Sequence, residues 1–145
     1  MVNQSNIDLV LFDFGGVFTA SPFFAVEAMA KEMAVDVEQF SELMFGAYHL
    51  DTDHPWHQLE RGELSFDEAR EQIIALGKQN DLTVDPLDLL IRMASGQLMQ
   101  EAMIDVLCEV KAAGFATGII TNNVREFRDG WRALMPVDEL IDCVF

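Results

Sequence analysis

An almost unbroken apolar segment near the amino terminus, 7–14 (IDLVLFDF), most limits how this chain can fold. A strand that is apolar at nearly every position is expected to be buried on both faces, as strands of parallel sheets are. A second apolar segment, 115–121 (FATGIIT), and the start of a third at Cys143 alternate with helix-like segments at 98–113 and 124–134. This alternation predicts an α/β fold with a parallel sheet and right-handed crossovers.

A long run of helical patterns separates the first two predicted strands. It is too long for a loop and too helical to join the sheet, so we predict a helical cap over the strand ends, where open α/β sheets bind ligands. The predicted core therefore comprises 1–20 and 97–145, and the predicted cap is 21–96. The expected helix starts are Ser21-Pro22, Asp36, Ser65 with Glu68 (a capping box), and Asp85-Pro86.

The amino-acid composition limits the kinds of molecule that the protein is expected to bind. With 9 basic and 25 acidic residues, the net charge of −16 argues against binding to nucleic acid or to anionic membranes, but leaves a small anionic substrate open. No apolar stretch reaches the ~18 residues of a membrane span, and the amino terminus lacks a basic leader region. Cys108 and Cys143 have no metal-type spacing and apolar neighbours. They are expected to be buried thiols of a soluble, cytoplasmic protein.

Residues that could act in catalysis or in anion binding follow both main strands. Asp13 precedes Gly15 and Gly16, where a carboxylate can act as a nucleophile and bare backbone N–H groups can approach an anion. Thr121 and Asn122 stand directly ahead of a predicted helix, whose N-terminus would add an anion cradle. Taken singly, the first pattern also fits an ordinary turn and the second a plain N-cap. Because neighbouring parallel strands end at the same sheet edge, the two together predict one site.

Two further groups have simpler alternatives. Arg125, Arg128 and Arg132 recur on one helical face, which fits either guidance of an anionic substrate or a solvated surface. A polar stretch could supply transition-metal ligands or be a polar loop of the cap; its candidate ligands are His49, Asp51, Asp53, His54 and His57.

The segments around Asp13 and Thr121 resemble a known family. LVLFDFGGVFT and GIITNN are similar to the first two motifs of the haloacid dehalogenase-like hydrolase superfamily, and HPWHQLERGELSFDEA resembles the group related to the phosphatase-like N-terminal domain of soluble epoxide hydrolase. The resemblance extends over essentially the whole chain. It implies a partial Rossmann-like core with an α-helical cap inserted after the first strand. It also implies Asp13 as the catalytic nucleophile and a phosphate-binding set of Gly15, Gly16, Thr121 and Asn122.

The chain departs from this family pattern in two ways. Gly15 occupies the position where family phosphatases usually carry a second Asp, the general acid and base. The chain also ends before the third and fourth motifs, which supply a Lys and acidic Mg²⁺ ligands. The resemblance therefore implies a fragment that is inactive alone. Its Mg²⁺ ligands would be the Asp13 carboxylate and the Gly15 carbonyl, which is an incomplete set.

The resulting interpretation is a phosphatase-type hydrolase that acts on a small anionic substrate through an aspartyl intermediate. The alternatives are a 2-haloacid dehalogenase-like hydrolase, or a non-catalytic homologue that acts only in protein association. In the family sheet the first strand is central, so here the strand at 7–14 should become an edge. An apolar edge without Pro or Lys is suited to pairing in a homodimer.

Overall fold

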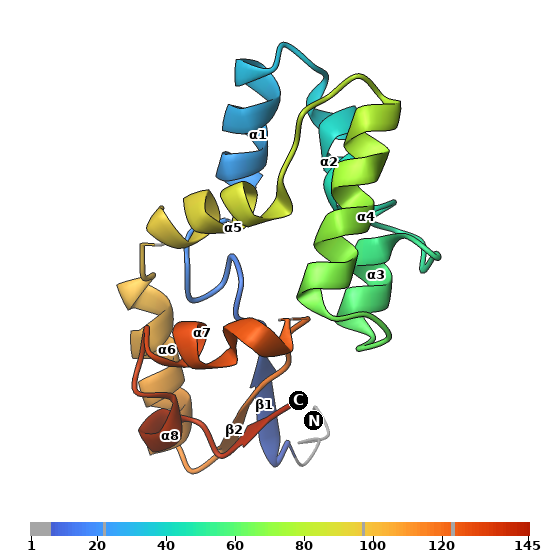
Figure 1. The fold of residues 1–145 in the computed structure, drawn as a ribbon. Helices are drawn as coiled ribbons and strands as arrows, with labels where there is room; N and C mark the ends of the chain where they lie inside the picture. Colours follow the sequence, from blue (N-terminus) through green and yellow to red (C-terminus); the bar gives the residue numbers. More distant parts are fainter. Residues whose placement is uncertain (1–6, 22, 97, 123) are drawn as a thin grey trace, which may run out of the picture. The chain divides into compact units, whose positions relative to one another are not determined.

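The computed structural model describes residues 7–21, 23–96, 98–122 and 124–145. The chain forms two compact units (Figure 1). The core unit comprises Met1–Ser21, Leu98–Asn122 and Phe127–Phe145, and the helical unit comprises Pro22–Gln97 and Asn123–Glu126. Pro22, expected to start a helix, lies outside the described residues.

The core unit contains a parallel sheet of three strands in the order β1-β2-β3. They are β1 Leu9–Phe12, β2 Ala116–Ile119 and β3 Cys143–Val144. The register places Phe12 opposite Ile119 and Gly118 opposite Cys143. The predicted α/β class with a parallel sheet is confirmed, and β1 has a neighbouring strand on one side only among the described residues.

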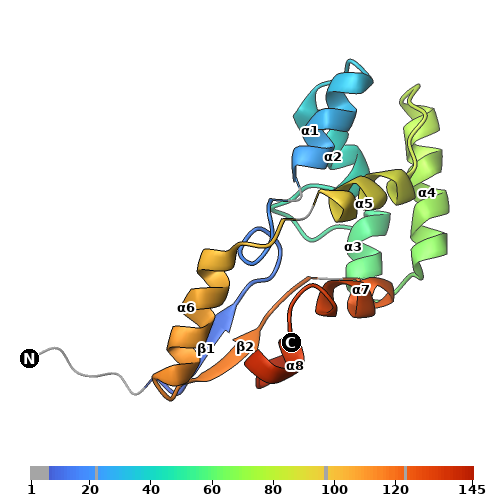
Figure 2. The ribbon, with the colours of Figure 1, turned by 90° about the vertical axis from the view of Figure 1, so that its left-hand side faces the viewer.

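The helices of the core unit are α6 Glu101–Ala112, α7 Arg128–Arg132 and α8 Val137–Leu140. They lie on the same side of the strands (Figures 1 and 2). Their side chains join Phe12 and Ile119 in one hydrophobic cluster that includes Leu107, Trp131 and Val137. Two right-handed crossovers that advance the sheet in the same direction leave their helices on the same face.

Among the described residues the other face of the sheet is largely exposed, so the expectation that β1 is buried on both faces is wrong. Leu9 and Leu11 are 38% and 44% exposed, and Ile120 after β2 is 51% exposed. Side chains alternate between the faces of a strand, so Val10 and Phe12 meet the helices while Leu9 and Leu11 do not. The buried thiol expected at Cys108 is also contradicted, because Cys108 is exposed on α6 and Cys143 is half-buried.

A polar cluster joins the amino end of β2 to the segment that leads into β3. Thr117 is fully buried, and its hydroxyl donates to the Leu140 carbonyl over 2.7 Å. The Asp142 carboxylate accepts the Thr117 N–H at 2.8 Å and pairs with Lys111 at 2.9 Å. The bond to Lys111, followed by those to Thr117, lowers the pKa of Asp142 to about 2.

The helical unit contains five α-helices within the described residues, and β2 is followed by a short 3-10 turn at Arg125–Phe127. The starts expected at Asp36, Ser65 and Asp85 are confirmed, since each side chain accepts a backbone N–H of its helix. Ser65 and Glu68 form the expected capping box. The helices are α1 Phe23–Glu32, α2 Val37–Phe45, α3 Pro55–Glu60, α4 Phe66–Gln79 and α5 Pro86–Ser95.

The chain leaves and re-enters the core unit through two adjacent extended segments. Thr19 and Met99 form an isolated antiparallel bridge, flanked by hydrogen bonds from Ala20 N to Leu98 O (2.9 Å) and from Gln100 N to Phe18 O (2.8 Å). Because residues 98–100 take part in this pairing, α6 begins at Glu101 rather than at the expected position 98. No helix in the described ranges is long and apolar enough to cross a membrane.

Candidate functional site

Asp13 and Thr121 lie at the same edge of the sheet. Phe12 ends β1 opposite Ile119 at the end of β2, and the Ile120 N–H donates to the Phe12 carbonyl over 2.9 Å. Since the strands are parallel, the residues that follow them emerge at the shared carboxyl end. Asp13 is exposed there and Thr121 is half-buried.

The Asp13 carboxylate is oriented by its own backbone. Oδ1 accepts the N–H of Phe14 over 2.6 Å, and Oδ2 has no hydrogen-bond partner within the part of the chain that the structure describes. One oxygen is therefore anchored and the other remains accessible. A carboxylate held in this way can present a lone pair to an electrophilic centre.

The turn after Asp13 leaves one backbone donor unused. The Phe14 carbonyl accepts from Val17 N (3.3 Å) and Phe18 N (3.0 Å), and the Gly16 N–H points to Thr19 Oγ1 at 3.4 Å. Among these described residues, only the Gly15 N–H between Phe14 and Phe18 lacks an intramolecular acceptor. Gly15, rather than Gly16, is therefore the glycine whose amide is free for an anion.

Thr19 was not identified from the sequence, although it organises this turn. Its side chain is fully buried, donates to the Ala20 carbonyl at 3.1 Å and faces the Gly16 amide. A Thr several residues beyond the Asp has no distinctive spacing, so the sequence offered no signal for it.

The anion cradle expected after β2 differs from the prediction. The Thr121 N–H donates to the Phe145 carbonyl at 3.2 Å, and the following structure is the 3-10 turn Arg125–Phe127 rather than the start of a long α-helix. Asn123 lies outside the described residues. The available groups at this strand end are thus the Thr121 hydroxyl and the exposed Asn122 side chain.

The Mg²⁺ ligand set is incomplete. The Asp13 carboxylate and the Gly15 carbonyl are two exposed oxygen donors, whereas Mg²⁺ requires six ligands in near-octahedral geometry. The described residues contain no group of three or more His, Cys, Asp or Glu side chains placed to hold a metal ion. The candidate ligands from His49 to His57 are among these residues and do not form such a group.

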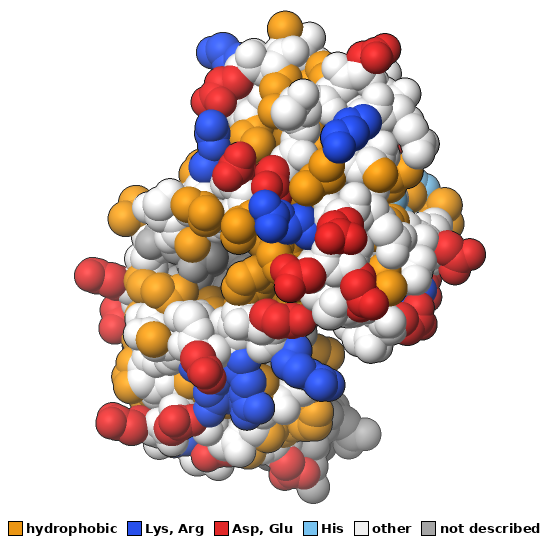
Figure 3. All heavy atoms as spheres, viewed as in Figure 1, with side chains coloured by type: hydrophobic (Ala, Val, Ile, Leu, Met, Phe, Trp, Pro, Cys, Tyr) orange, Lys and Arg blue, Asp and Glu red, His pale blue; other side chains and the backbone are white. Residues whose placement is uncertain are grey.

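The three arginines differ in their contacts. Arg132 is paired with Asp138 and lies over the Trp131 ring at 5.8 Å, whereas Arg125 and Arg128 are exposed. Lys and Arg side chains gather on the core unit around α7 (Figure 3). Arg132 is therefore held in a structural contact, whereas the positive charge of Arg128 on α7 is accessible.

Solved structures with the same architecture were found at low sequence identity. The L-2-haloacid dehalogenase from Xanthobacter autotrophicus, with chloropropionic acid covalently bound, aligns with a TM-score of 0.57 and 15% identity, over 96% of this chain and 56% of that one. A HAD family enzyme from Bacteroides thetaiotaomicron, in complex with magnesium and inorganic phosphate, aligns with a TM-score of 0.58 and 15% identity, over 97% of this chain and 68% of that one.

The chain thus spans little more than half the length of the dehalogenase. No protein family profile and no curated protein matches it. At 15% identity the structural likeness bears on the fold alone, and that fold is the one that the two sequence motifs predicted. The chain has the haloacid dehalogenase-like fold.

Proposed function

We propose that the protein is a hydrolase that uses Asp13 as a covalent nucleophile on a small anionic substrate. The accessible Oδ2 of Asp13, with the unused N–H of Gly15 two residues later in the same turn, carries this proposal. In the phosphatase-type reaction, Oδ2 attacks phosphorus and the P–O bond to the leaving group breaks. Water then attacks the phosphorus of the aspartyl phosphate, which releases phosphate and restores the carboxylate.

The anionic part of the substrate would be held by fixed donors at the sheet edge. The Gly15 N–H, the Thr121 hydroxyl and the Asn122 amide are all available there. Donors of this kind stabilise charge that develops on the transferred group, and each is worth about 2.7–4 kcal/mol of transition-state energy in well-formed sites. Mg²⁺, if bound at Asp13 and Gly15, would supply further charge neutralisation.

Gly15 supports a second candidate, a dehalogenase-like reaction. Gly15 provides no carboxylic acid to protonate a leaving group, and general acid catalysis is worth about 10²–10⁴-fold. A halide ion can leave unprotonated, whereas an alkoxide leaving group needs a proton from a general acid. In this reaction Oδ2 displaces halide from carbon, and water then attacks the aspartyl ester at its carboxyl carbon.

The nucleophile is tested by Asp13→Asn, with Asp8→Asn, an exposed Asp just before β1, as the matched control. Turnover is measured on phosphomonoesters with leaving groups of graded acidity and on 2-haloacids, each with and without Mg²⁺. We expect Asp13→Asn to reduce kcat by at least about a thousandfold, because an amide cannot form the ester. Asp8→Asn should have no effect, and unchanged kcat in Asp13→Asn would contradict the assignment.

The two chemistries differ in where solvent oxygen is incorporated. In H₂¹⁸O, attack of water on phosphorus places the label in the released phosphate and leaves Asp13 unlabelled. Attack of water on the aspartyl ester places the label in the Asp13 carboxylate. Mass spectrometry of the peptide that contains Asp13, after a single turnover, therefore distinguishes a phosphatase from a dehalogenase.

We also propose that the chain self-associates through β1. Leu9 and Leu11 are exposed and apolar, and the residues from Ile7 to Phe12 include no Pro or Lys that would block pairing. The Asp8 and Phe12 carbonyls accept the N–H groups of Ala116, at the start of β2, and of Ile120, just after its end. Backbone groups of successive residues in a strand point to opposite edges, so those of Leu9 and Leu11 face the open edge of β1. A second copy paired along this edge would satisfy them.

A further inference from the structure

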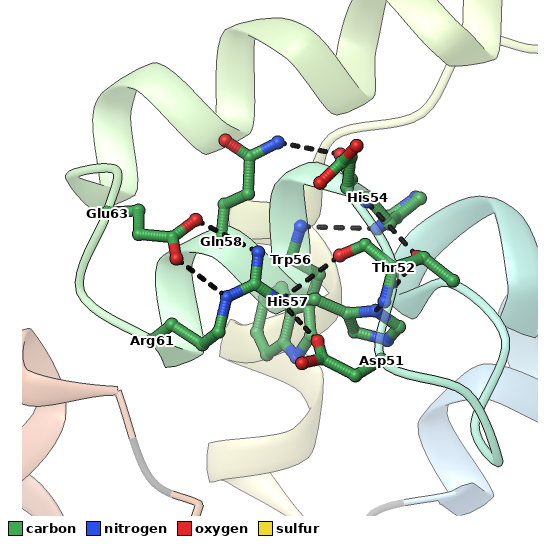
Figure 4. Close-up of polar contacts among 9 residues, drawn as sticks. Asp51, Thr52, His54, Trp56, His57, Gln58, Arg61 and Glu63 are labelled. Atoms are coloured by element: carbon green, nitrogen blue, oxygen red, sulfur yellow. Dashed lines mark hydrogen bonds and ion pairs between the residues drawn. The ribbon is translucent and has the colours of Figure 1, made fainter.

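The segment 51–61, which contains α3, is organised around two imidazole rings (Figure 4). His54 is the N-cap of α3, and its Nδ1 accepts the Trp56 N–H at 3.2 Å. Its Nε2 lies 3.2 Å from the Leu43 carbonyl of α2. A carbonyl only accepts, so Nε2 must carry the proton and Nδ1 must be bare. The neutral Nε2–H form of His54 therefore satisfies both bonds, and the imidazolium does not.

His57 acts in the same way on the loop before α3. Its Nδ1 accepts the Thr52 N–H at 3.1 Å and lies 3.0 Å from Thr52 Oγ1. That hydroxyl oxygen in turn accepts the His54 N–H at 3.2 Å. The Thr52 hydroxyl hydrogen thus points to His57 Nδ1, which is an acceptor for two groups of the same residue.

Both rings pack against the backbone of Gly46, which caps the carboxyl end of α2. A Cβ added at Gly46 would lie 2.9 Å from Cβ and Cγ of His54 and 3.0 Å from Cε1 of His57. The two half-buried rings meet edge to face, with centroids 5.8 Å apart. This packing leaves little room for either ring to turn and exchange its nitrogens.

Among the described residues, no charged group around the rings is placed to stabilise a positive charge on His54. From α2, the facing groups are the Leu43 carbonyl and Gly46, neither of which titrates. From α3, Glu60 accepts the Trp56 indole N–H at 2.9 Å. The Arg61 guanidinium pairs with Asp51 and Glu63, and the remaining carboxylate of the preceding loop, Asp53, is exposed.

Burial has the largest effect and lowers the pKa of His54; the bond to the Leu43 carbonyl raises it by less, and the neighbouring His57 lowers it by a still smaller amount. The sign of the pH dependence follows. A group whose folded pKa lies below its unfolded value of about 6.5 takes up its proton more readily when the segment is open. The closed form is therefore fully favoured above pH ~6.5 and loses stability as the pH falls toward the folded pKa.

We propose that segment 51–61 is an acid-labile element of the helical unit, closed while His54 is neutral and released when His54 is protonated. A proton on Nδ1 replaces an acceptor by a donor that faces another N–H. The start of α3 and the Thr52 turn then lose their hydrogen bonds together, because the Thr52 hydroxyl connects the two histidines.

The test is amide hydrogen exchange of the full 145-residue chain, followed by NMR at pH 7.5 and pH 5.5 and expressed as protection factors. The probes are the Thr52 and Trp56 amides, and the reference is the Ala69 amide, bonded to Ser65 O in α4. For His54, an unfolded pKa of about 6.5 allows up to about a tenfold loss of protection over this interval. The Ala69 amide should keep its protection factor.

Asn supplies an acceptor at nearly the position of His Nδ1 but does not titrate. His54→Asn should therefore abolish the pH dependence at Trp56 and, because the His54 N–H is bonded to Thr52 Oγ1, at Thr52 as well. The third histidine of the chain, the exposed His49, provides the control: His49→Asn should leave both dependences intact. Nitrogen-15 NMR should also find Nδ1 of His54 unprotonated at pH 7.5.

Three results would overturn the proposal. They are equal protection of Trp56 at both pH values, loss of the pH dependence in His49→Asn, and a proton on Nδ1 of His54 at neutral pH. Because the tautomer is read directly from wild-type protein, the test does not depend on whether a variant folds.

Discussion

Gly16 has a backbone conformation that other residues adopt at a cost, and substitution by Ala measures that cost. Its φ is +78°, and, its two chain neighbours aside, the only described atom within 4 Å of an added Cβ is the Ser21 Cα at 4.0 Å. The methyl group therefore fits, and the penalty comes from the left-handed backbone alone, about 1–2 kcal/mol. At Gly15, φ lies outside that region and nothing lies within 4 Å. Gly15→Ala should be neutral, or stabilise by about 0.4–1 kcal/mol through the unfolded chain.

The assay is urea unfolding of the core unit, followed by Trp131 fluorescence. The chain has two Trp residues, so a Trp56→Phe background removes the signal of the helical unit. We expect the midpoint to fall for Gly16→Ala and not for Gly15→Ala, with the same m value in both. Equal destabilisation by the two substitutions would show that the turn after Asp13 does not have the conformation described.

Two further predictions concern the core unit. The bonds from Lys111 and Thr117 lower the folded pKa of Asp142 to about 2, so the contribution of Asp142 to stability is complete above its unfolded pKa near 4 and is lost as the pH falls toward 2. Asp142→Asn should therefore make the stability of the core unit less dependent on pH between about 4 and 2. Asp105→Asn, on the exposed surface of α6, should leave that dependence unchanged. For the proposed pairing of β1, light scattering across a concentration series should show self-association, and the Leu9 and Leu11 amides should gain protection with concentration; a concentration-independent monomer would contradict it.

The sequence predicted the elements whose cause is local. Asp36, Ser65 and Asp85 start helices because their side chains accept nearby backbone N–H groups, and such caps are visible in the order of residues. The start of α3 was less clear, since its cap is the imidazole of His54, which is not among the usual capping residues. The Asp13–Thr121 edge was predicted because parallel strands bring their carboxyl ends together whatever lies between them.

The errors concern features that depend on distant parts of the chain. An apolar strand predicts burial, but whether both of its faces are covered depends on the hand and direction of the crossovers, which leave Leu9 and Leu11 exposed. The 3-10 turn after Thr121 likewise replaces the expected helix N-terminus, although the helical residue pattern begins at the same place. Thr19 is buried by tertiary packing alone, which no local pattern signals.

The bridge between Thr19 and Met99 makes the helical segment a modular insertion. Its two ends are joined side by side, with the Ala20 N–H on the Leu98 carbonyl and the Gln100 N–H on the Phe18 carbonyl. The core unit therefore keeps the same connection whether the segment between them is long or short. Loop closure entropy rises only with the logarithm of loop length, so a tight hairpin, or a different set of helices, could replace residues 22–97 at a modest thermodynamic cost. The Asp13 turn lies within the core unit, so an exchange of the insertion would leave it unchanged.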